Sequence, residues 1–449
     1  MVIMSSAIDT VAPLPSDALL LFLLQTGVLL ALALALGRLA RRTGLPGIVG
    51  ELAAGVLLGP SLLGLLAPGV SAWLLPRDAA QMHLLDAVGQ LGVLLLVGFT
   101  GTHVDPGLVR RHGGTAAGIS AGALLIPLGL GICLGLALPG RLRPAGDGGW
   151  VFACFTGVAL CVSSIPVVGR VLVDMNLAHR TVGQLILVVA SVDDAVGWVL
   201  VSVVTALART GTGVQDIAAP FWHLGVLLLV TLTGGRWTIR RIMRWASRSA
   251  SSGTPVTAAV VLLVLAGAGT QALGFEALLG AFLCGILIGS CPAEQVRHLK
   301  PLDSTVLSFL SPLFFALAGL RIDLASLAHT TTAQWALIVL GTAVVSKFLG
   351  AFAGNARGRL SFRETVAVGA GINARGVVQI VIAVIGVRLG LLNAAMYSIL
   401  VLIAVVTPAM APVILKAAMK RVEQTEEETA RERRELALSA VETGHHARA

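Results

Sequence analysis

The amino-acid sequence predicts an all-α polytopic membrane protein with about 13 transmembrane helices. Hydrophobic residues make up 56% of the chain and charged residues only 12%, whereas soluble domains carry about 25% charged residues. The mean hydropathy is +0.89. The apolar residues form runs of 17 or more, which are long enough for a helix to cross a bilayer.

Thirteen such runs follow one another along the chain, separated mostly by short loops. We expect each run to form one membrane-spanning helix. The expected spans are 17–37, 46–66, 84–103, 114–138, 149–172, 182–207, 218–235, 254–273, 275–291, 305–321, 333–354, 365–387 and 391–416.

The basic residues in the loops indicate the orientation of the chain. If the first loop is cytoplasmic, the cytoplasmic loops hold seventeen lysines and arginines and the opposite loops hold five. This bias places the N-terminus outside and the C-terminus in the cytoplasm. Only four of the 32 basic residues are lysines, and together with the bias toward Ala, Leu and Gly this suggests a bacterial cell membrane.

Three regions follow from this pattern. Residues 1–16 form an extracytoplasmic segment without the features of a signal peptide, 17–416 form the transmembrane domain, and 417–449 form a charged cytoplasmic tail. The positive charges are scattered over loops and form no continuous patch, which argues against a nucleic-acid ligand. We find no nucleotide-binding motif and expect no cofactor and no enzymatic activity.

An internal repeat connects the second and the ninth span. The segments GLPGIVGELAAGVLLG (44–59) and GFEALLGAFLCGILIG (274–289) carry four glycines in the same register. A second pair of segments, GTHVD (101–105) and GLRID (319–323), follows in the same order. Small residues line helix contacts in any membrane bundle, but the constant register favours a duplication. By the topology above, the two copies cross the membrane in opposite senses, as in inverted-repeat transporters.

Two adjacent acids, Asp193 and Asp194, lie in the middle of the sixth span. A charged side chain at that depth costs at least about 2.5–3.5 kcal/mol, so a pair of carboxylates indicates an ion or proton site. Neighbouring residues on a helix are rotated by about 100°, so the two side chains cannot face the same partner. A buried ion pair without a transport role is the alternative.

Lys347 lies near the middle of the eleventh span and is the only lysine within the expected membrane region before the last helix. It is the natural partner for one of the two aspartates. The alternative is that its long side chain extends to the membrane surface.

Two spans contain sequences that interrupt a helix. The fifth span carries CVSSIP (161–166), which ends in Pro166, and the twelfth carries GINARG (371–376), which includes Asn373, Arg375 and Gly376. Broken helices near the midplane expose carbonyl groups and helix ends that can coordinate ions. A simple kink or a helix end is the alternative, and it is less favourable for the twelfth span because Arg375 needs a partner or water.

Several segments together resemble a known family. They are RRTGLPGIVGELAAGVLLGPSLLG, LGVLLLVGFTGTHVD, VDDAVGW, PLFFALAGLRIDL and GINARGVVQIVIAVIG. In this order they are similar to the sodium/hydrogen exchanger domain of the monovalent cation:proton antiporter-2 family. The resemblance covers residues 17–416.

The resemblance implies a core domain with two crossing broken helices, a separate dimerisation domain and a homodimer in the lipid bilayer. It implies that Asp194 binds cation and proton in turn and that Asp193 pairs with Lys347, the pattern of electrogenic exchangers. Ser163, Ser164 and Thr156 would contribute oxygens near the ion.

The predicted function is exchange of Na⁺ or Li⁺ for H⁺ by alternating access. Exchange of K⁺ for H⁺, export of an organic or ionophore-bound cation, and a sensor without transport remain as alternatives. Two positions depart from the family pattern. Val162-Ser163 stands in the break of the fifth span where related sequences often carry a threonine, and Gln379 stands where they often carry a glutamate four residues after the arginine.

Overall fold

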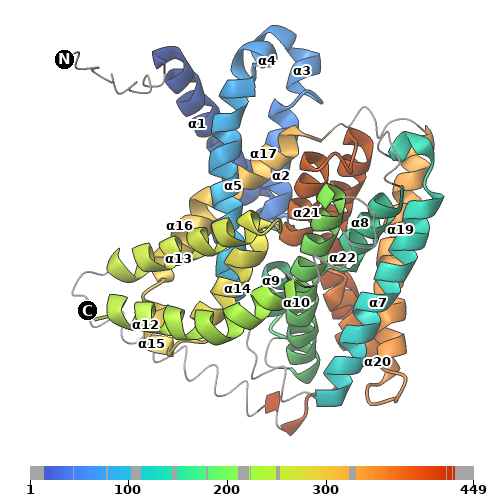
Figure 1. Ribbon diagram of the computed structural model, residues 1–449. Helices are drawn as coiled ribbons and strands as arrows, with labels where there is room; N and C mark the ends of the chain where they lie inside the picture. Colours follow the sequence, from blue (N-terminus) through green and yellow to red (C-terminus); the bar gives the residue numbers. More distant parts are fainter. Residues whose placement is uncertain are drawn as a thin grey trace.

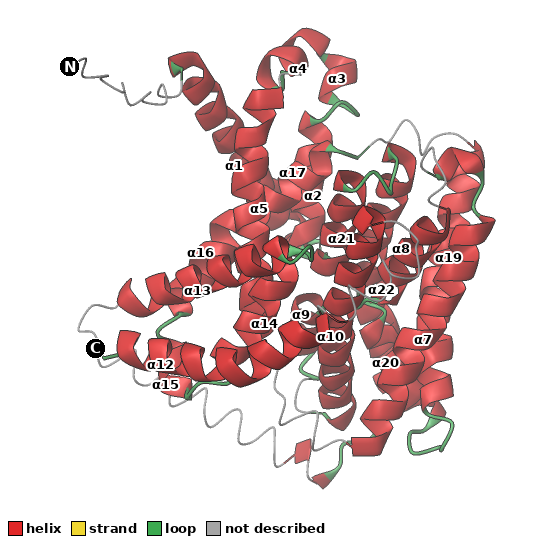
Figure 2. Ribbon diagram, viewed as in Figure 1, coloured by secondary structure: helices red, strands yellow, loops and turns green. Residues whose placement is uncertain are grey.

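The computed structural model describes residues 15–429 except for 44, 77–78, 103–112, 144–148, 178–179, 211–221, 223, 249–252, 323–329, 421 and 427. Within this part of the chain every regular element is a helix (Figure 2). The elements are α1 (Ser16–Arg42), α2 (Gly47–Leu58), α3 (Leu63–Leu66), α4 (Pro68–Leu74), α5 (Ala79–Thr102), α7 (Gly113–Ala137), η1 (Gly140–Leu142), α8 (Gly149–Cys161), α9 (Ile165–Asp174), α10 (Thr181–Thr210), η2 (Thr231–Gly235), α12 (Arg236–Ala246), α13 (Gly253–Ala272), α14 (Ala277–Gly289), α15 (Ala293–Arg297), α16 (Lys300–Thr305), η3 (Val306–Leu310), α17 (Ser311–Leu320), α19 (Thr330–Gly354), α20 (Phe362–Ile372), α21 (Val377–Arg388) and α22 (Ala394–Met419).

The all-α membrane fold that the sequence predicts is confirmed. Among the described residues, nine helices are long and apolar enough to cross a membrane, or ten if α20 and α21 form one bent span. Further apolar helices of 10–17 residues, α8 and α14, lie where the sequence predicts spans. The total of thirteen spans stays a prediction.

The helices form two groups that lie side by side (Figure 1). In one group α7 packs between α8 and α19, and α20 and α21 pack on α22. In the other group α2 packs between α1 and α17, and α14 packs between α5 and α13. The groups meet where α10 contacts α14.

The repeated glycines of α2 and α14 allow close helix contacts. A Cβ on Gly55 would overlap the carbonyl oxygen of Ala316 in α17, and a Cβ on Gly285 would overlap that of Gly98 in α5. Earlier in each helix, Gly50 and Gly280 approach the preceding helix in the same way. The two copies of the repeated segment therefore make equivalent contacts. Gly44 and the ends of the second repeated pair, at 105 and 323, lie outside the described residues.

One segment that the sequence assigns to a cytoplasmic loop is helical. The seventh expected span ends in a π-helical turn, η2, and the chain continues as α12. Ile239, Met243 and Ala246 bury one face of α12, whereas Trp237 and Trp245 are exposed. The spacing of these three apolar residues allows the arginine-rich segment to pack as a helix.

Candidate ion-binding site

The two interrupted spans lie against each other at their breaks. The chain leaves helical conformation at Val162–Ser164 between α8 and α9, and at Asn373–Gly376 between α20 and α21, where the two helices are bent by 45°. Ser163 Oγ lies 2.7 Å from the carbonyl oxygen of Ile372. Gly376 is needed for this approach, because a Cβ there would lie 2.5 Å from Val167 Cγ2.

Lys347 of α19 reaches the first break. Its Nζ lies 2.7 Å from Asp193 Oδ2 and 2.9 Å from Ser163 Oγ. It also donates to the carbonyl oxygens of Cys161 at 2.6 Å and Ala123 at 3.2 Å. The side chains of Lys347 and Asp193 are both fully buried, so the lysine does not extend to the membrane surface. Four oxygen acceptors thus hold one ammonium group between α7, α8 and α10.

Asp194 has a different environment from Asp193. The backbone N–H of Ile165, the first residue of α9, donates to Asp194 Oδ2 at 3.2 Å. Pro166 follows at the second position of this helix, where a missing N–H costs nothing. The helix N-terminus is a favourable place for a carboxylate. Asp194 Oδ1 has no hydrogen-bond partner among the described residues, although the residue is 0% exposed.

Arg375 is fully buried in the second break. Its Nη2 donates to the carbonyl oxygens of Leu160 at 2.6 Å and Ala343 at 3.0 Å. No acid of the described chain lies within salt-bridge distance of Arg375. Its Nε and Nη1 lack partners in that part of the chain, as do both amide atoms of Gln379. With glutamine at position 379, the buried guanidinium of Arg375 thus has no ion pair among the described residues.

The other predicted ligands divide into two sets. Ser164 Oγ and the amide oxygen and nitrogen of Asn373 are buried at the breaks without partners among the described residues, so Ser164 Oγ and Asn373 Oδ1 are available as ligands. Thr156 lies within α8, where its hydroxyl donates to the carbonyl oxygen of Phe152 at 2.9 Å. Its side chain faces Gly135 of α7, and its place near the ion stays a prediction.

Some parts of the site could not be named from the sequence because they are backbone groups. The carbonyl oxygens of Ala123 and Cys161, which bind Lys347, and the N–H of Ile165, which binds Asp194, carry no residue-type signal. Only the break before Pro166 indicated that a helix would begin there.

The oxygen atoms without partners at the breaks suit a hard monovalent cation. Carboxylate, hydroxyl and amide oxygens are the ligands that such ions prefer. Within the described chain no group of three or more His, Cys, Asp or Glu side chains is placed so that it could hold a metal ion.

This architecture defines a class of protein. A multi-pass helical membrane protein with buried charges at two adjoining broken helices has the organisation of secondary transporters and not of enzymes. The chain belongs to the family described as "Sodium/hydrogen exchanger, transmembrane", whose model matches residues 28–421.

Similar proteins carry related names. The chain is 28% identical over 408 residues to the Na(+)/H(+) antiporter NhaS4 of Synechocystis sp., covering 89% of this chain and 98% of that protein. It is 28% identical over 420 residues to Cation/H(+) antiporter 18 of Arabidopsis thaliana, covering 92% of this chain and 50% of the plant protein. The chain therefore spans about half the length of that plant relative.

A solved structure supports the fold. The sodium proton antiporter MjNhaP1 from Methanocaldococcus jannaschii matches with a TM-score of 0.66 at 18% identity, over 90% of this chain and 97% of the other. At this identity the match concerns the fold alone.

Proposed function

We propose that this protein is a secondary active antiporter that exchanges Na⁺ or Li⁺ for H⁺, with Asp194 as the shared binding site. The observation that carries the proposal is the environment of Asp194. The carboxylate is fully buried at a helix break, and one of its oxygens has no partner among the described residues. The names of the relatives as cation/H(+) and Na(+)/H(+) antiporters support the same activity.

Competition between the two ions follows from simple electrostatics. A deprotonated Asp194, with Ser164 and Asn373 as further oxygen donors, binds a partly dehydrated cation. When Asp194 is protonated it loses the charge that attracts the cation, so one ion displaces the other. The bound ion then crosses when the group of helices that holds the site, α7–α10 and α19–α22, moves against the other group, and no nucleotide is consumed.

The buried charges around the site balance one another. Asp193 and Asp194 carry two negative charges when ionised, and Lys347 and Arg375 carry two positive charges, so the site without an occupant is neutral. A proton or a monovalent cation on Asp194 adds the same charge. In our proposal Lys347 holds Asp193 while the proton is bound, and Asp193 is released to assist the cation.

The domain organisation is part of the proposal. The core would comprise α7–α10 and α19–α22, and the other group of helices would form the dimerisation domain of a homodimer in the bilayer. The equivalent glycine contacts of α2 and α14 support an inverted repeat. The charge bias of the loops supports a cytoplasmic C-terminus.

The identity of the cation is the main alternative. The chain is 24% identical over 382 residues to K(+)/H(+) antiporter 1 of Saccharomyces cerevisiae, covering 81% of this chain and 42% of the yeast protein. Na⁺/H⁺ exchange and K⁺/H⁺ exchange would use the same binding site. The two hypotheses differ in the size of the cavity that holds the cation. An organic or ionophore-bound cation is a further alternative.

Transport in inverted vesicles tests the proposal. Addition of Na⁺ should relieve the quenching of a pH-sensitive dye with the native chain but not with Asp194→Asn. Ser191→Ala is the matched control, because the Ser191 hydroxyl on the same helix donates to the carbonyl oxygen of Leu187 at 2.7 Å. Full activity of Asp194→Asn would refute the shared site. Replacing Na⁺ by K⁺ in the same assay separates the two cations.

A further inference from the structure

Three polar side chains continue from Asp194 toward the C-terminal end of α10. They are Trp198, Ser202 and Thr205, which follow at intervals of four, four and three residues. This spacing places all four residues on one face of the helix. Trp198 is 1% exposed and both hydroxyl residues are 0% exposed.

The polar atoms on this face lack partners among the residues that the structure describes. Trp198 Nε1, Ser202 Oγ and Thr205 Oγ1 have no hydrogen-bond partner in the described part of the chain. The usual solution within a helix is a bond to the carbonyl four residues earlier, which Ser191 makes on α10 and Thr407 makes on α22. A buried polar group without a partner costs about 1–3 kcal/mol. Three in a row are therefore expensive unless another state of the protein provides partners.

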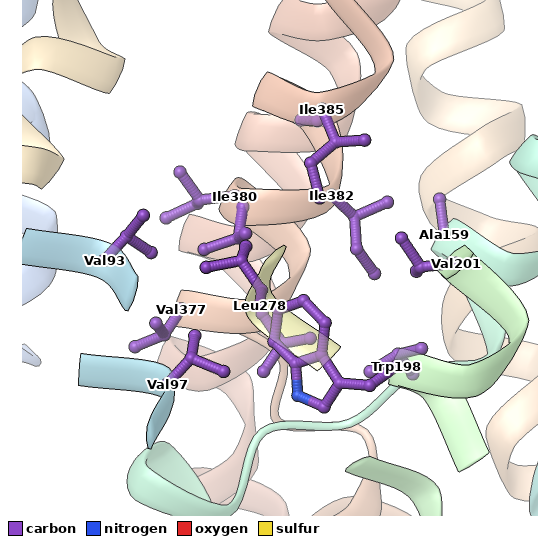
Figure 3. Close-up of a cluster of buried hydrophobic side chains, with 14 of the residues drawn as sticks. Val93, Val97, Ala159, Trp198, Val201, Leu278, Val377, Ile380, Ile382 and Ile385 are labelled. Carbon is purple, nitrogen blue, oxygen red and sulfur yellow. The ribbon is translucent and has the colours of Figure 1, made fainter. Parts of the chain in front are cut away.

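The same face lies between the two groups of helices. The ring centroid of Trp198 lies 6.3 Å from that of Phe282 in α14, at an interplanar angle of 41°. Figure 3 shows Trp198 extending from α10 into an apolar cluster with Leu278 of α14, Val97 of α5 and Val377 of α21. These neighbours belong to both groups, so relative movement of the groups would change the surroundings of this face.

We infer that the face of α10 formed by Trp198, Ser202 and Thr205 lines the path of the hydrated cation between Asp194 and the membrane side on which α10 ends. The contact between Trp198 and Phe282 closes this path in the present structure. When the groups separate, water can accept from the Trp198 N–H and bind both hydroxyls, and the hydroxyl oxygens of Ser202 and Thr205 supply ligands of the kind that hard cations prefer. The inference rests on the proposed function. It adds the route that the cation takes to Asp194 and the two residues, Trp198 and Phe282, that close this route.

Accessibility to a thiol reagent tests the path without measuring transport. Ser202→Cys and Thr205→Cys are introduced singly into the full chain, with Cys133 and Cys154 replaced because these are the two native cysteines that are not buried. A membrane-impermeant maleimide is applied to vesicles of either orientation. We expect labelling from the side where α10 ends, at a rate that changes severalfold between Na⁺ at alkaline pH and no Na⁺ at acid pH.

The matched control is Ser191→Cys, which lies on the same helix on the other side of Asp194. It should stay unlabelled from the side that reaches Thr205→Cys. Phe282→Leu removes the closing ring while it keeps an apolar side chain, and it should raise the labelling rate of Ser202→Cys severalfold. Phe152→Leu, a fully buried change in α8, should leave that rate unchanged.

The outcomes separate the two proposals. A chain that exchanges Na⁺ for H⁺ while both cysteines stay unreactive under every condition overturns the path and leaves the antiport. Labelling that responds to Na⁺ and pH in a chain that moves no cation supports the path and overturns the antiport. Equal labelling of all three cysteines indicates general loosening and also overturns the path.

Discussion

Lys347 Nζ and Asp193 Oδ2 lie 2.7 Å apart, and neither side chain is accessible to solvent. Removing one partner of such a buried pair is strongly destabilising, by about 3–5 kcal/mol, because the other charge is left unpaired. The pair also lies beside the oxygen atoms that we assign to the transported ions. Loss of either partner should therefore affect both folding and transport.

Lys347→Ala should lower the thermal unfolding temperature in detergent and displace the pH optimum of transport to higher pH. Without a neighbouring cation the aspartates hold protons more readily, so the cation competes only at lower proton concentration. The double variant Asp193→Asn, Lys347→Met should be more stable than Lys347→Ala. An unchanged pH profile for Lys347→Ala would remove the lysine from the mechanism.

Gln379→Glu should raise the stability of the protein. The buried guanidinium of Arg375 has two nitrogens without partners among the described residues, and residue 379 lies four positions further along the chain. A carboxylate there can form the missing ion pair. Thermal unfolding of Gln379→Glu and of the control Gln379→Ala measures the effect. A lower unfolding temperature for the glutamate than for the alanine variant would contradict this account of Arg375.

Gly285→Ala and Gly55→Ala should both prevent native packing. In each case the added methyl group would overlap a carbonyl oxygen of a neighbouring helix, which cannot move without shifting that helix. Gly269→Ala in α13 is the control, because an added Cβ there meets nothing within 4 Å. It should be neutral or stabilising by up to about 1 kcal/mol, since alanine favours helix more than glycine. The yield of folded protein in size-exclusion chromatography distinguishes the variants.

The first residues of the tail are attached to the start of α10. Glu428 Oε2 lies 2.9 Å from Arg180 Nε, and the backbone N–H groups of Thr181 and Thr425 donate to the Glu428 carboxylate at 2.7 and 3.0 Å. Burial acts to raise the pKa of Glu428, but these hydrogen bonds and Arg180 outweigh it and hold the pKa below its ordinary value of 4.5. The contact thus stabilises the docked tail above about pH 4.5 and is lost as the pH falls through the lowered value.

Glu428→Gln should release the tail at neutral pH. We expect limited proteolysis to remove the tail faster from this variant than from the native chain, and faster from the native chain at acid pH than at neutral pH with an acid-tolerant protease. Glu426→Gln is the control, because Glu426 is exposed. Equal cleavage of both variants at neutral pH would show that the ion pair does not hold the tail.

Much of the site could be predicted from residue types. Charged side chains are rare in apolar spans, so each of four residues could be identified as a candidate site residue: Asp193, Asp194, Lys347 and Arg375. Because two of them are acids and two are bases, ion pairing between them could be expected. The break before Pro166 was visible because proline is favoured in the first turn of a helix and disfavoured in its interior, although Pro127, Pro408 and Pro412 lie inside α7 and α22. The assignment of Thr156 near the ion followed from the resemblance alone, and the structure places its hydroxyl against its own helix.

The sequence by itself determined that the chain crosses a membrane, where its helices break and which charges are buried, because hydropathy, proline and ionisable residues act locally. Only the tertiary structure decided that the carbonyl oxygens of Ala123 and Cys161 accept from Lys347, that the N–H of Ile165 faces Asp194, and that the polar face of α10 lies against α14. These relationships join residues far apart in the chain through backbone groups and helix packing, which leave no trace in residue type.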